Sequence, residues 1–219
     1  MPTAPVLRRV LLALCLLWPL PAVANEARFD HYLLALTWMP SFCEIEGDAR
    51  DDARCAEGSG HGWMVHGLWP QHEGGTWPEF CRTPHRNPTR RETAAQADLF
   101  GASGSAWHQW NKHGRCTGLS APDYYALTRD ALDGLTLPED LVAPGDQRRL
   151  APEAVIEAMV AFNPGLAPEM MVATCPRGLI LELRLCLTLE LEPRACDAEL
   201  LSRSCPRPRI RLPGPRTAP

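Results

Sequence analysis

The sequence predicts a single α+β domain fastened by four disulfides. Strand-like and helix-like segments follow one another without the regular alternation that builds a parallel sheet, which is typical of the α+β class. Without residues 1–24, which have the pattern of an export leader, the chain has 195 residues, a length suited to one domain with a sizeable core. The remaining cysteines are even in number, as expected when all of them are paired.

Three segments have the pattern of strands. Residues 29–38 form an apolar run that is typical of a buried strand. Residues 62–70 begin as a second strand and stop at Gly67 and Pro70. Residues 179–191 alternate Leu with Glu, Arg, Cys and Thr, which indicates a strand with two different faces.

Three other segments have the spacing of helices. We expect helices over residues 106–116, over residues 122–132, where a proline stands near the first turn, and over residues 152–162, which an Asn-Pro-Gly sequence ends. Between these elements, the charged residues 40–62 indicate a loop, and residues 72–92 are rich in Pro, Arg and Gly and indicate irregular structure.

The start of the chain predicts export. Two arginines precede an apolar run at residues 10–20, and a small-x-small sequence ends at Ala24, so residues 1–24 have the pattern of a signal peptide. The apolar run is about half of the ~20 residues that a membrane-spanning helix needs, so we expect no membrane anchor. Cys15 raises the alternative of a lipoprotein signal, but Leu14 stands where such a signal needs a small residue. We therefore expect a periplasmic or secreted protein.

Eight cysteines remain after the leader is removed. In an exported chain an even number of cysteines indicates disulfides, here four, although sequence alone permits 105 pairings. Zinc binding is the alternative, but the sequence has no C-x-x-C pair and the spacings are long and irregular. The eight are Cys43, Cys55, Cys81, Cys116, Cys175, Cys186, Cys196 and Cys205.

The charge balance argues against a protein that coats nucleic acid. Removing the leader also removes Arg8 and Arg9, which leaves 26 acidic side chains against 20 Lys and Arg. A tight nucleic-acid binder normally has a basic patch and a high pI. The balance suits an enzyme that engages a few phosphates and releases them. Residues 206–219 hold four Arg and four Pro before the final proline, and we expect a disordered basic tail.

Two short segments concentrate the residue types that carry chemistry. The first is His66-Gly67-Leu68-Trp69-Pro70, and the second is residues 107–116, WHQWNKHGRC. On a helix, side chains three and four positions apart share a face. The second segment therefore groups Gln109, Lys112 and His113 and places His108 beside Lys112, which suits a polyanionic substrate.

The remaining histidines and tryptophans have simpler interpretations. Most single histidines are surface or core residues, so we leave out of the site His31, His61, His72 and His85. For Trp69, core packing and a functional role are about equally supported. We expect core positions for Trp63, Trp107 and Trp110.

The two segments resemble the two active-site signatures of the ribonuclease T2 family, H-G-L-W-P and H-E-W-x-K-H-G-T-C. Residues 29–43 also resemble the opening strand and first cysteine of the family, and residues 163–165 and the final four cysteines fit as well. The resemblance thus covers nearly the whole mature chain, with residues 25–205 as the catalytic domain. It implies an antiparallel sheet flanked by helices and the pairs Cys43–Cys55, Cys81–Cys116, Cys175–Cys205 and Cys186–Cys196.

The resemblance implies an endoribonuclease that cleaves single-stranded RNA by transesterification to a 2′,3′-cyclic phosphate, with slower hydrolysis of that product and without a metal or cofactor. RNA carries its own nucleophile, the 2′-hydroxyl. Two imidazoles can hold opposite protonation states at mildly acidic pH. By resemblance, His113 is the base, His66 is the acid and Lys112 stabilises charge on phosphorus. His108 would help to hold the phosphate, and Trp69 would stack on a base. We expect a monomer with single-stranded RNA as its partner.

The chain departs from the family pattern at two positions. Gln109 replaces the usual Glu and Arg115 the usual Thr. An amide cannot relay a proton, but Gln109 can still donate a hydrogen bond to a phosphoryl oxygen. The departures put the rate and the pH optimum in doubt more than the type of reaction.

Three rival functions remain. A non-catalytic relative that binds RNA or a protein would be expected to lack a catalytic histidine or Lys112, and all are present. A zinc hydrolase would need H-E-x-x-H, whereas His108 and His113 are five positions apart. A Ser or Cys hydrolase is disfavoured because the cysteines are paired and no G-x-S-x-G sequence is present.

Overall fold

A four-stranded antiparallel sheet forms the centre of the molecule. The computed structural model describes residues 29–142 and 148–217, so the predicted leader lies outside the described residues. The strands lie in the order β2-β1-β5-β4, and every neighbouring pair is antiparallel. This confirms the predicted α+β class with an antiparallel sheet. The strands are β1 (His31–Trp38), β2 (Trp63–Gln71), β4 (Met171–Thr174) and β5 (Glu182–Leu187).

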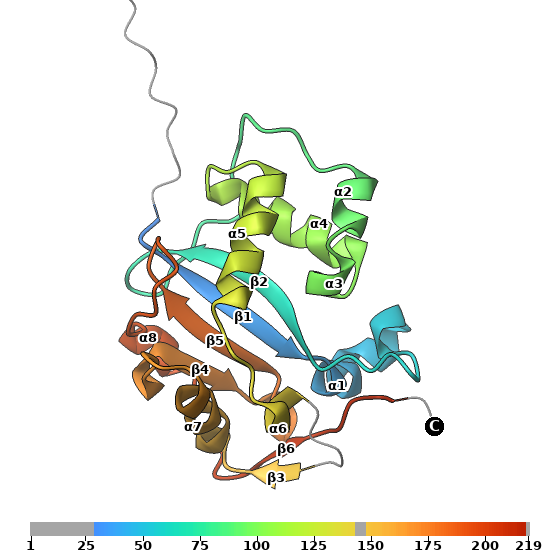
Figure 1. The fold of residues 1–219 in the computed structure, drawn as a ribbon, viewed down its shortest axis with the longest axis vertical. Helices are drawn as coiled ribbons and strands as arrows, with labels where there is room; N and C mark the ends of the chain where they lie inside the picture. Colours follow the sequence, from blue (N-terminus) through green and yellow to red (C-terminus); the bar gives the residue numbers. More distant parts are fainter. Residues whose placement is uncertain (1–28, 143–147, 218–219) are drawn as a thin grey trace, which may run out of the picture.

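The helices surround this sheet, as Figure 1 shows. Helix α5 crosses one face of the sheet, while α2, α3 and α4 gather beyond β2, and α7 lies near β4. A second, two-stranded sheet pairs β3 (Arg148–Leu150) with β6 (Ile210–Leu212). The helices are α1 (Met39–Phe42), α2 (Arg90–Ala94), α3 (Ala97–Phe100), α4 (Ser103–Lys112), α5 (Ala121–Asp133), α6 (Glu139–Val142), α7 (Pro152–Phe162) and α8 (Ala198–Leu201).

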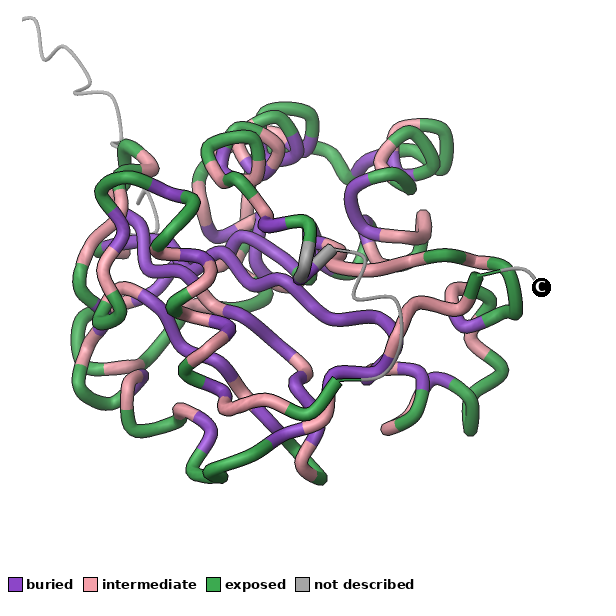
Figure 2. Tube along the Cα trace, turned by 60° about the horizontal axis from the view of Figure 1, so that its bottom comes forward, coloured by how far each residue is buried: buried purple, intermediate pink, exposed green. Residues whose placement is uncertain are grey.

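The two faces of β1 separate two apolar clusters. Every residue of β1 is buried, as expected for a strand with neighbours on both sides and cover on both faces. Leu34 and Leu36 point into the larger cluster, which includes Trp110 of α4 and Tyr124 of α5. Leu33 points to the opposite face, into a smaller cluster with α8. Figure 2 shows these buried strands running between exposed loops.

A β-bulge in β2 separates one residue from the regular pairing. Ala35 of β1 pairs with Gly67 and Leu36 pairs with Val65, so His66 is the extra residue between them. Bulges re-aim a side chain and often lie beside active sites. His66 lines the hollows on the face of the sheet that also carries residues 182 and 184 of β5.

Four disulfides fasten the fold, as predicted. They join Cys43 to Cys55, Cys81 to Cys116, Cys175 to Cys205 and Cys186 to Cys196, which are the pairs that the resemblance implies. Among the described residues, no helix has the length and apolar character needed to cross a membrane.

The prediction of a disordered tail is wrong for residues 206–217. Ile210 and Leu212 are buried, and their strand β6 pairs with β3. The carbonyl oxygen of Pro213 accepts a hydrogen bond from the indole of Trp38, and Arg216 pairs with Asp48. The tail is therefore part of the domain, because two apolar side chains and its backbone find partners far away in the sequence.

Several element boundaries also differ from expectation. Residues 40–62 include α1 and short helical turns, where a loop was expected, and β5 covers only the middle of residues 179–191. Helix α4 begins at Ser103 and ends at Lys112, before the predicted end at residue 116. Trp110 is buried as predicted, but Trp107 is 43% exposed, so its predicted core position is wrong.

Candidate active site

His66 lies at the open side of the site and has a carboxylate partner. Its side chain is 44% exposed. The ring Nδ1 lies 2.5 Å from Oε1 of Glu182, at the start of β5. The bulge in β2 thus presents the imidazole of His66 to the site. Its Nδ1 is bonded to Glu182, and its Nε2 remains for a substrate.

Glu182 is a buried carboxylate held from two sides. Its side chain is only 8% exposed. Besides the contact with His66, its Oε2 accepts hydrogen bonds from Nε and Nη2 of Arg184, at 2.9 and 2.5 Å. Burial alone would raise the pKa of Glu182, but the hydrogen bond from His66 and the charges of His66 and Arg184 outweigh burial and lower it to about 2. Glu182 therefore remains an anion over the whole range in which histidines titrate.

His113 follows directly after α4 and closes the other side of the site. Its backbone N–H donates to the carbonyl oxygen of Gln109, as in a last helical turn. Gly114 comes next because a Cβ there would lie 2.6 Å from the Trp110 ring and 2.8 Å from that of Tyr124. The glycine lets the chain pass close to these rings and turn toward Cys116.

His113 is buried, and no carboxylate of the described residues contacts it as Glu182 contacts His66. It is only 5% exposed, and its Nδ1 has no hydrogen-bond partner among the described residues. Burial, helped by the positive charge of Lys112 and by His66 and His108, lowers the pKa of His113 to about 3. The ring is therefore a neutral imidazole at mildly acidic pH.

Trp69 connects the two histidines. Its ring stacks on that of His113, with centroids 5.2 Å apart, and meets the His66 ring edge-on at 5.0 Å. Its indole N–H donates to Oε1 of Gln109 at 2.9 Å. A Cβ at position 67 would lie 2.2 Å from that same oxygen, so Gly67 leaves the room that this bond needs. Trp69 thus holds the two histidine rings and the side chain of Gln109 together.

Two further basic side chains of α4 face the same space. His108 has a lowered pKa because of its burial and of the nearby charge of Lys112. The ammonium group of Lys112 lies 3.4 Å from the carboxylate of Glu79 on the preceding loop. An anionic substrate would have to compete with Glu79 for this lysine.

All six site residues that the sequence predicts line one hollow with a cavity volume of about 230 Å³. A larger hollow of about 690 Å³ adjoins it and shares four lining residues, His66, His108, Gln109 and Arg184. The shared residues lie where the two hollows meet, so an extended polymer could occupy both with its reacting group beside the histidines. The six residues are His66, Trp69, His108, Gln109, Lys112 and His113.

Sequence reasoning missed the contribution of β5. Glu182 and Arg184 line the larger hollow and contact two predicted site residues, His66 and Trp69. The available signal was the alternation in residues 179–191, which puts Glu182 and Arg184 on one face of an otherwise apolar strand. That pattern does not by itself say which histidine the carboxylate reaches.

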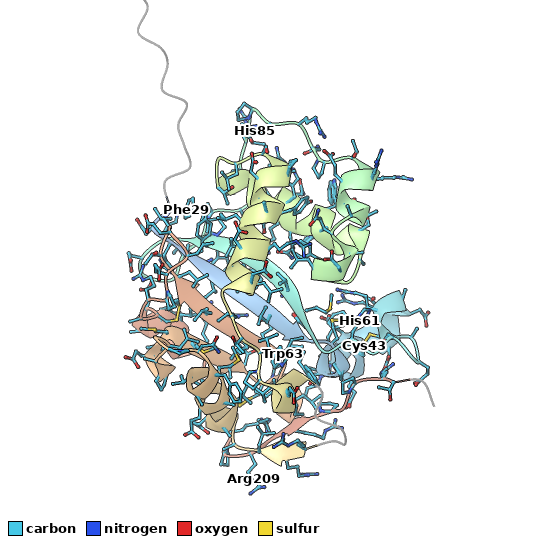
Figure 3. All side chains as sticks on the ribbon, viewed as in Figure 1. Phe29, Cys43, His61, Trp63, His85 and Arg209 are labelled. Atoms are coloured by element: carbon cyan, nitrogen blue, oxygen red, sulfur yellow. A yellow bond between two sulfur atoms is a disulfide. The ribbon has the colours of Figure 1, made fainter. Side chains whose placement is uncertain are left out.

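The histidines that were left out of the site do not join it. Figure 3 shows His85 on the loop that joins β2 to α2, and His61 lies just before β2. His31 lies with Glu73 and Asp197 in a group that could hold a cation. The guanidinium of Arg194 already contacts both carboxylates, at 2.7 and 3.7 Å. We therefore assign no metal to this group.

The arrangement provides two imidazoles of opposite character around one hollow. One is exposed and bonded to a buried carboxylate, and the other is buried near positive charge, which favours its neutral form. Paired groups whose environments separate their protonation states are the usual basis of general acid–base catalysis. The site can therefore give a proton from one side and accept one from the other.

Part of this chain is similar in sequence to known proteins. The profile of the Ribonuclease T2 family matches residues 29–145. A ribonuclease of Aeromonas hydrophila is 35% identical over 109 residues, which are 50% of this chain and 47% of that protein. A probable ribonuclease of Haemophilus influenzae is 31% identical over 124 residues, covering 52% of this chain and 46% of that protein. The chain thus spans about half the length of these curated relatives.

Solved structures share the fold at low sequence identity. An RNase-related protein from Calystegia sepium has a TM-score of 0.65 at 18% identity, covering 85% of this chain and 98% of that one. RNase NT, solved in complex with 5′-AMP, has a TM-score of 0.62 at 19% identity, covering 85% of this chain and 99% of that one. At such identities, the likeness establishes the fold and no more.

Proposed function

The chain belongs to the ribonuclease T2 family, and from this premise we propose that it is an endoribonuclease that cleaves single-stranded RNA to a 2′,3′-cyclic phosphate. One observation carries the mechanism, namely the contrast between the two histidines. His66 is exposed and bonded to a carboxylate, while His113 is buried beside Lys112. This contrast supports His66 as the general acid and His113 as the general base.

The proposed reaction requires no group that these residues do not supply. His113 takes the proton of the 2′-hydroxyl while the 2′-oxygen attacks phosphorus. The bond from phosphorus to the 5′-oxygen breaks, and His66 gives its proton to that oxygen. The cyclic phosphate is hydrolysed more slowly by the reverse roles, with water in the place of the leaving hydroxyl.

The basic residues of α4 would act on the phosphate itself. Lys112 would stabilise the charge that develops on the phosphoryl oxygens, because a positioned cation is most effective where charge appears in the transition state. His108 would help to hold the phosphate, and the amide of Gln109 can donate a hydrogen bond while its oxygen stays bonded to Trp69. Trp69, which lines the hollow with the two histidines, would stack on a base of the RNA.

We also propose an exported monomer. Disulfides form and persist in oxidising compartments, and the four in this domain fit the periplasm or the exterior of the cell. The signal-peptide pattern at residues 1–24 supports the same location. No partner other than RNA is needed for the proposed reaction.

The reaction type can be tested with two substrates and a chelator. RNA should be cleaved at an undiminished rate in excess EDTA, and the first product should be a 2′,3′-cyclic phosphate. An otherwise identical oligonucleotide with a single 2′-deoxyribose on the 5′ side of the cut should be inert, because it lacks the nucleophile. Cleavage of that oligonucleotide, or loss of activity in EDTA, would contradict the mechanism. RNA binding without any cleavage would instead indicate a non-catalytic relative.

A further inference from the structure

The side chains of β5 touch the catalytic cluster at two points, although neither histidine segment lies near them in the sequence. Glu182 contacts His66, and the guanidinium of Arg184 lies 5.5 Å from the Trp69 ring centroid. We propose that Glu182 is a positioning residue that keeps His66 protonated and aims its ring at the leaving oxygen, with Arg184 holding Glu182 in place. This inference rests on the proposed function and names a residue that the family signatures do not contain.

The direction of the His66 ring follows from the atom that Glu182 contacts. The carboxylate binds Nδ1, so Nε2 is the nitrogen left for a substrate in the hollow. A carboxylate bonded to one imidazole nitrogen fixes both the ring orientation and the position of the proton, which is how a buried Asp serves the histidine of a serine protease. In RNA cleavage the same arrangement would direct Nε2–H toward the departing 5′-oxygen.

The partners of the buried carboxylate keep it an anion. An isolated charge in such a place would be strongly unfavourable, and Glu182 is tolerated because His66 and Arg184 bond to it. The pKa of Glu182, about 2, keeps it ionised at every pH where the enzyme would work. A fixed anion at hydrogen-bond distance favours the imidazolium form of His66.

Arg184 has a distinct part in this arrangement. Both of its hydrogen bonds go to Oε2 of Glu182, which leaves Oε1 for His66. Charge-assisted hydrogen bonds of this kind restrict the position of the acceptor more than a neutral pair does. The guanidinium also competes with His66 for the negative charge, so Arg184 both positions the carboxylate and limits how strongly it favours the imidazolium.

The other charged groups around His66 work against its protonation. His108 and Lys112 of α4 line the same hollow as His66, and His113 follows directly after this helix; the cationic Lys112 repels an imidazolium. Glu46 and Arg50 line the outer part of the larger hollow, where they pair with each other. Glu182 is therefore the anion in direct contact with His66 that offsets the positive charges of α4.

The experiment compares variants of β5 through the pH dependence of kcat/KM on a defined RNA dinucleotide. In Glu182→Gln the basic limb, where the acid loses its proton, should move to lower pH by about 1 unit, a loss of about tenfold on that side of the profile. Glu182→Asp keeps the charge and should restore the limb at least in part. Arg184→Gln removes a competing cation and should move the basic limb the opposite way, to higher pH.

Glu190→Gln is the matched control, because Glu190 is exposed in the turn after β5. This control should leave the profile unchanged. A purely structural role for Glu182 would lower the rate equally at all pH values, without moving the limb and without opposite shifts in the Glu182 and Arg184 variants. Either of those results would overturn the inference.

A second measurement does not depend on activity. The protein labelled with ¹⁵N-histidine should show the Nδ1 proton of His66 in a strong hydrogen bond, and this downfield resonance should be absent in Glu182→Gln. Its absence from the wild-type protein would contradict the pairing even if a variant failed to fold. A wild-type protein that shows the resonance but cleaves no RNA would contradict the proposed function and leave the pairing supported.

Discussion

The two histidines of the site are held by opposite means. His66, on the sheet side, is exposed and held by hydrogen bonding to a charged neighbour on β5. His113, on the helix side, is buried and packs on Trp69. The Cys81–Cys116 disulfide fixes the chain three residues after His113. Two side chains of the same type thus acquire different chemical characters from two different kinds of neighbour.

This comparison teaches that the surroundings alone can give two residues of the same type different chemical characters. Burial and nearby cations favour the neutral form, while an adjacent carboxylate favours the charged form. Both histidines line a single hollow, and Trp69 contacts both of their rings. The contrast between the two histidines therefore depends on the fold. Substitutions near His66 and substitutions near His113 should change it independently.

The largest effect on the cleavage rate is expected from replacing each histidine. A substrate with a different leaving group then distinguishes the two histidines. His66→Ala and His113→Ala should each reduce cleavage of RNA by about 10²–10⁴-fold, the usual contribution of a general acid or base. On a nucleoside 3′-(4-nitrophenyl phosphate), whose leaving group departs without a proton, His66→Ala should recover most of its activity. His113→Ala should stay impaired, because the 2′-hydroxyl still needs a base.

Rates on both substrates check this prediction. The exposed His85, on the loop that joins β2 to α2, provides the matched control, and His85→Ala should resemble the wild-type protein with either substrate. Recovery of His113→Ala in place of His66→Ala would reverse the assignment of acid and base.

A smaller effect should come from the disulfide on the helix side. Replacing Cys81 and Cys116 by Ser should lower the free energy of unfolding by about 2–4 kcal/mol and also reduce kcat, because Cys116 ends the turn that carries His113. The Cys43–Cys55 pair does not line the hollow of the two histidines, so its removal should destabilise the protein with little change in kcat. Urea unfolding and kinetics at a temperature where all variants are folded separate the two effects. Equal kinetic losses in both variants would show that the helix side has no special dependence on its bridge.

The smallest effect concerns the charge beside the base. Gln109→Glu would place an anion against Trp69, close to the ring of His113. An anion there raises the pKa of His113 from its low value of about 3 and so moves the acid limb of kcat/KM to higher pH, by about 1 unit. Asn111→Asp adds the same charge on α4, but Asn111 is bonded to Arg115, so this control should shift the limb less. If the acid limb stayed in place in Gln109→Glu, the side chain at position 109 would not influence the pKa of the base.

The sequence predicts local structure well where the pattern is long. Helix α7 has the predicted bounds, and the first two strands begin and end within two residues of expectation, because each has a clear periodicity or a strong stop signal. Trp107 shows the limit of the method. The buried positions on α4 are Ala106, Gln109 and Trp110, so a tryptophan one residue after Ala106 falls at the edge of that stripe and is exposed.

The tail and the carboxylate partner of His66 were beyond the reach of sequence reasoning for one common reason. Ile210 and Leu212 have the two-residue spacing of a strand, but two apolar residues among Arg and Pro are too few to indicate one. Glu182 lies 116 positions from His66, and they meet only because β1 lies between β2 and β5 in the sheet. The histidine segments were found because their residues are adjacent in the sequence, whereas these contacts depend on topology.

The position of β1 between strands so distant in sequence has a consequence for synthesis. Strand β1 (His31–Trp38) is synthesised early, but its neighbour β5 (Glu182–Leu187) is synthesised much later. The carbonyl of Pro213, which accepts the hydrogen bond of Trp38, is synthesised later still. A nascent chain that has exposed both histidine segments therefore still lacks the sheet neighbour and the carboxylate of β5. Domains fold as units, and contacts of long sequence separation form late. A chain still being translated would thus hold both histidine segments in an unfinished site, without the carboxylate that His66 contacts.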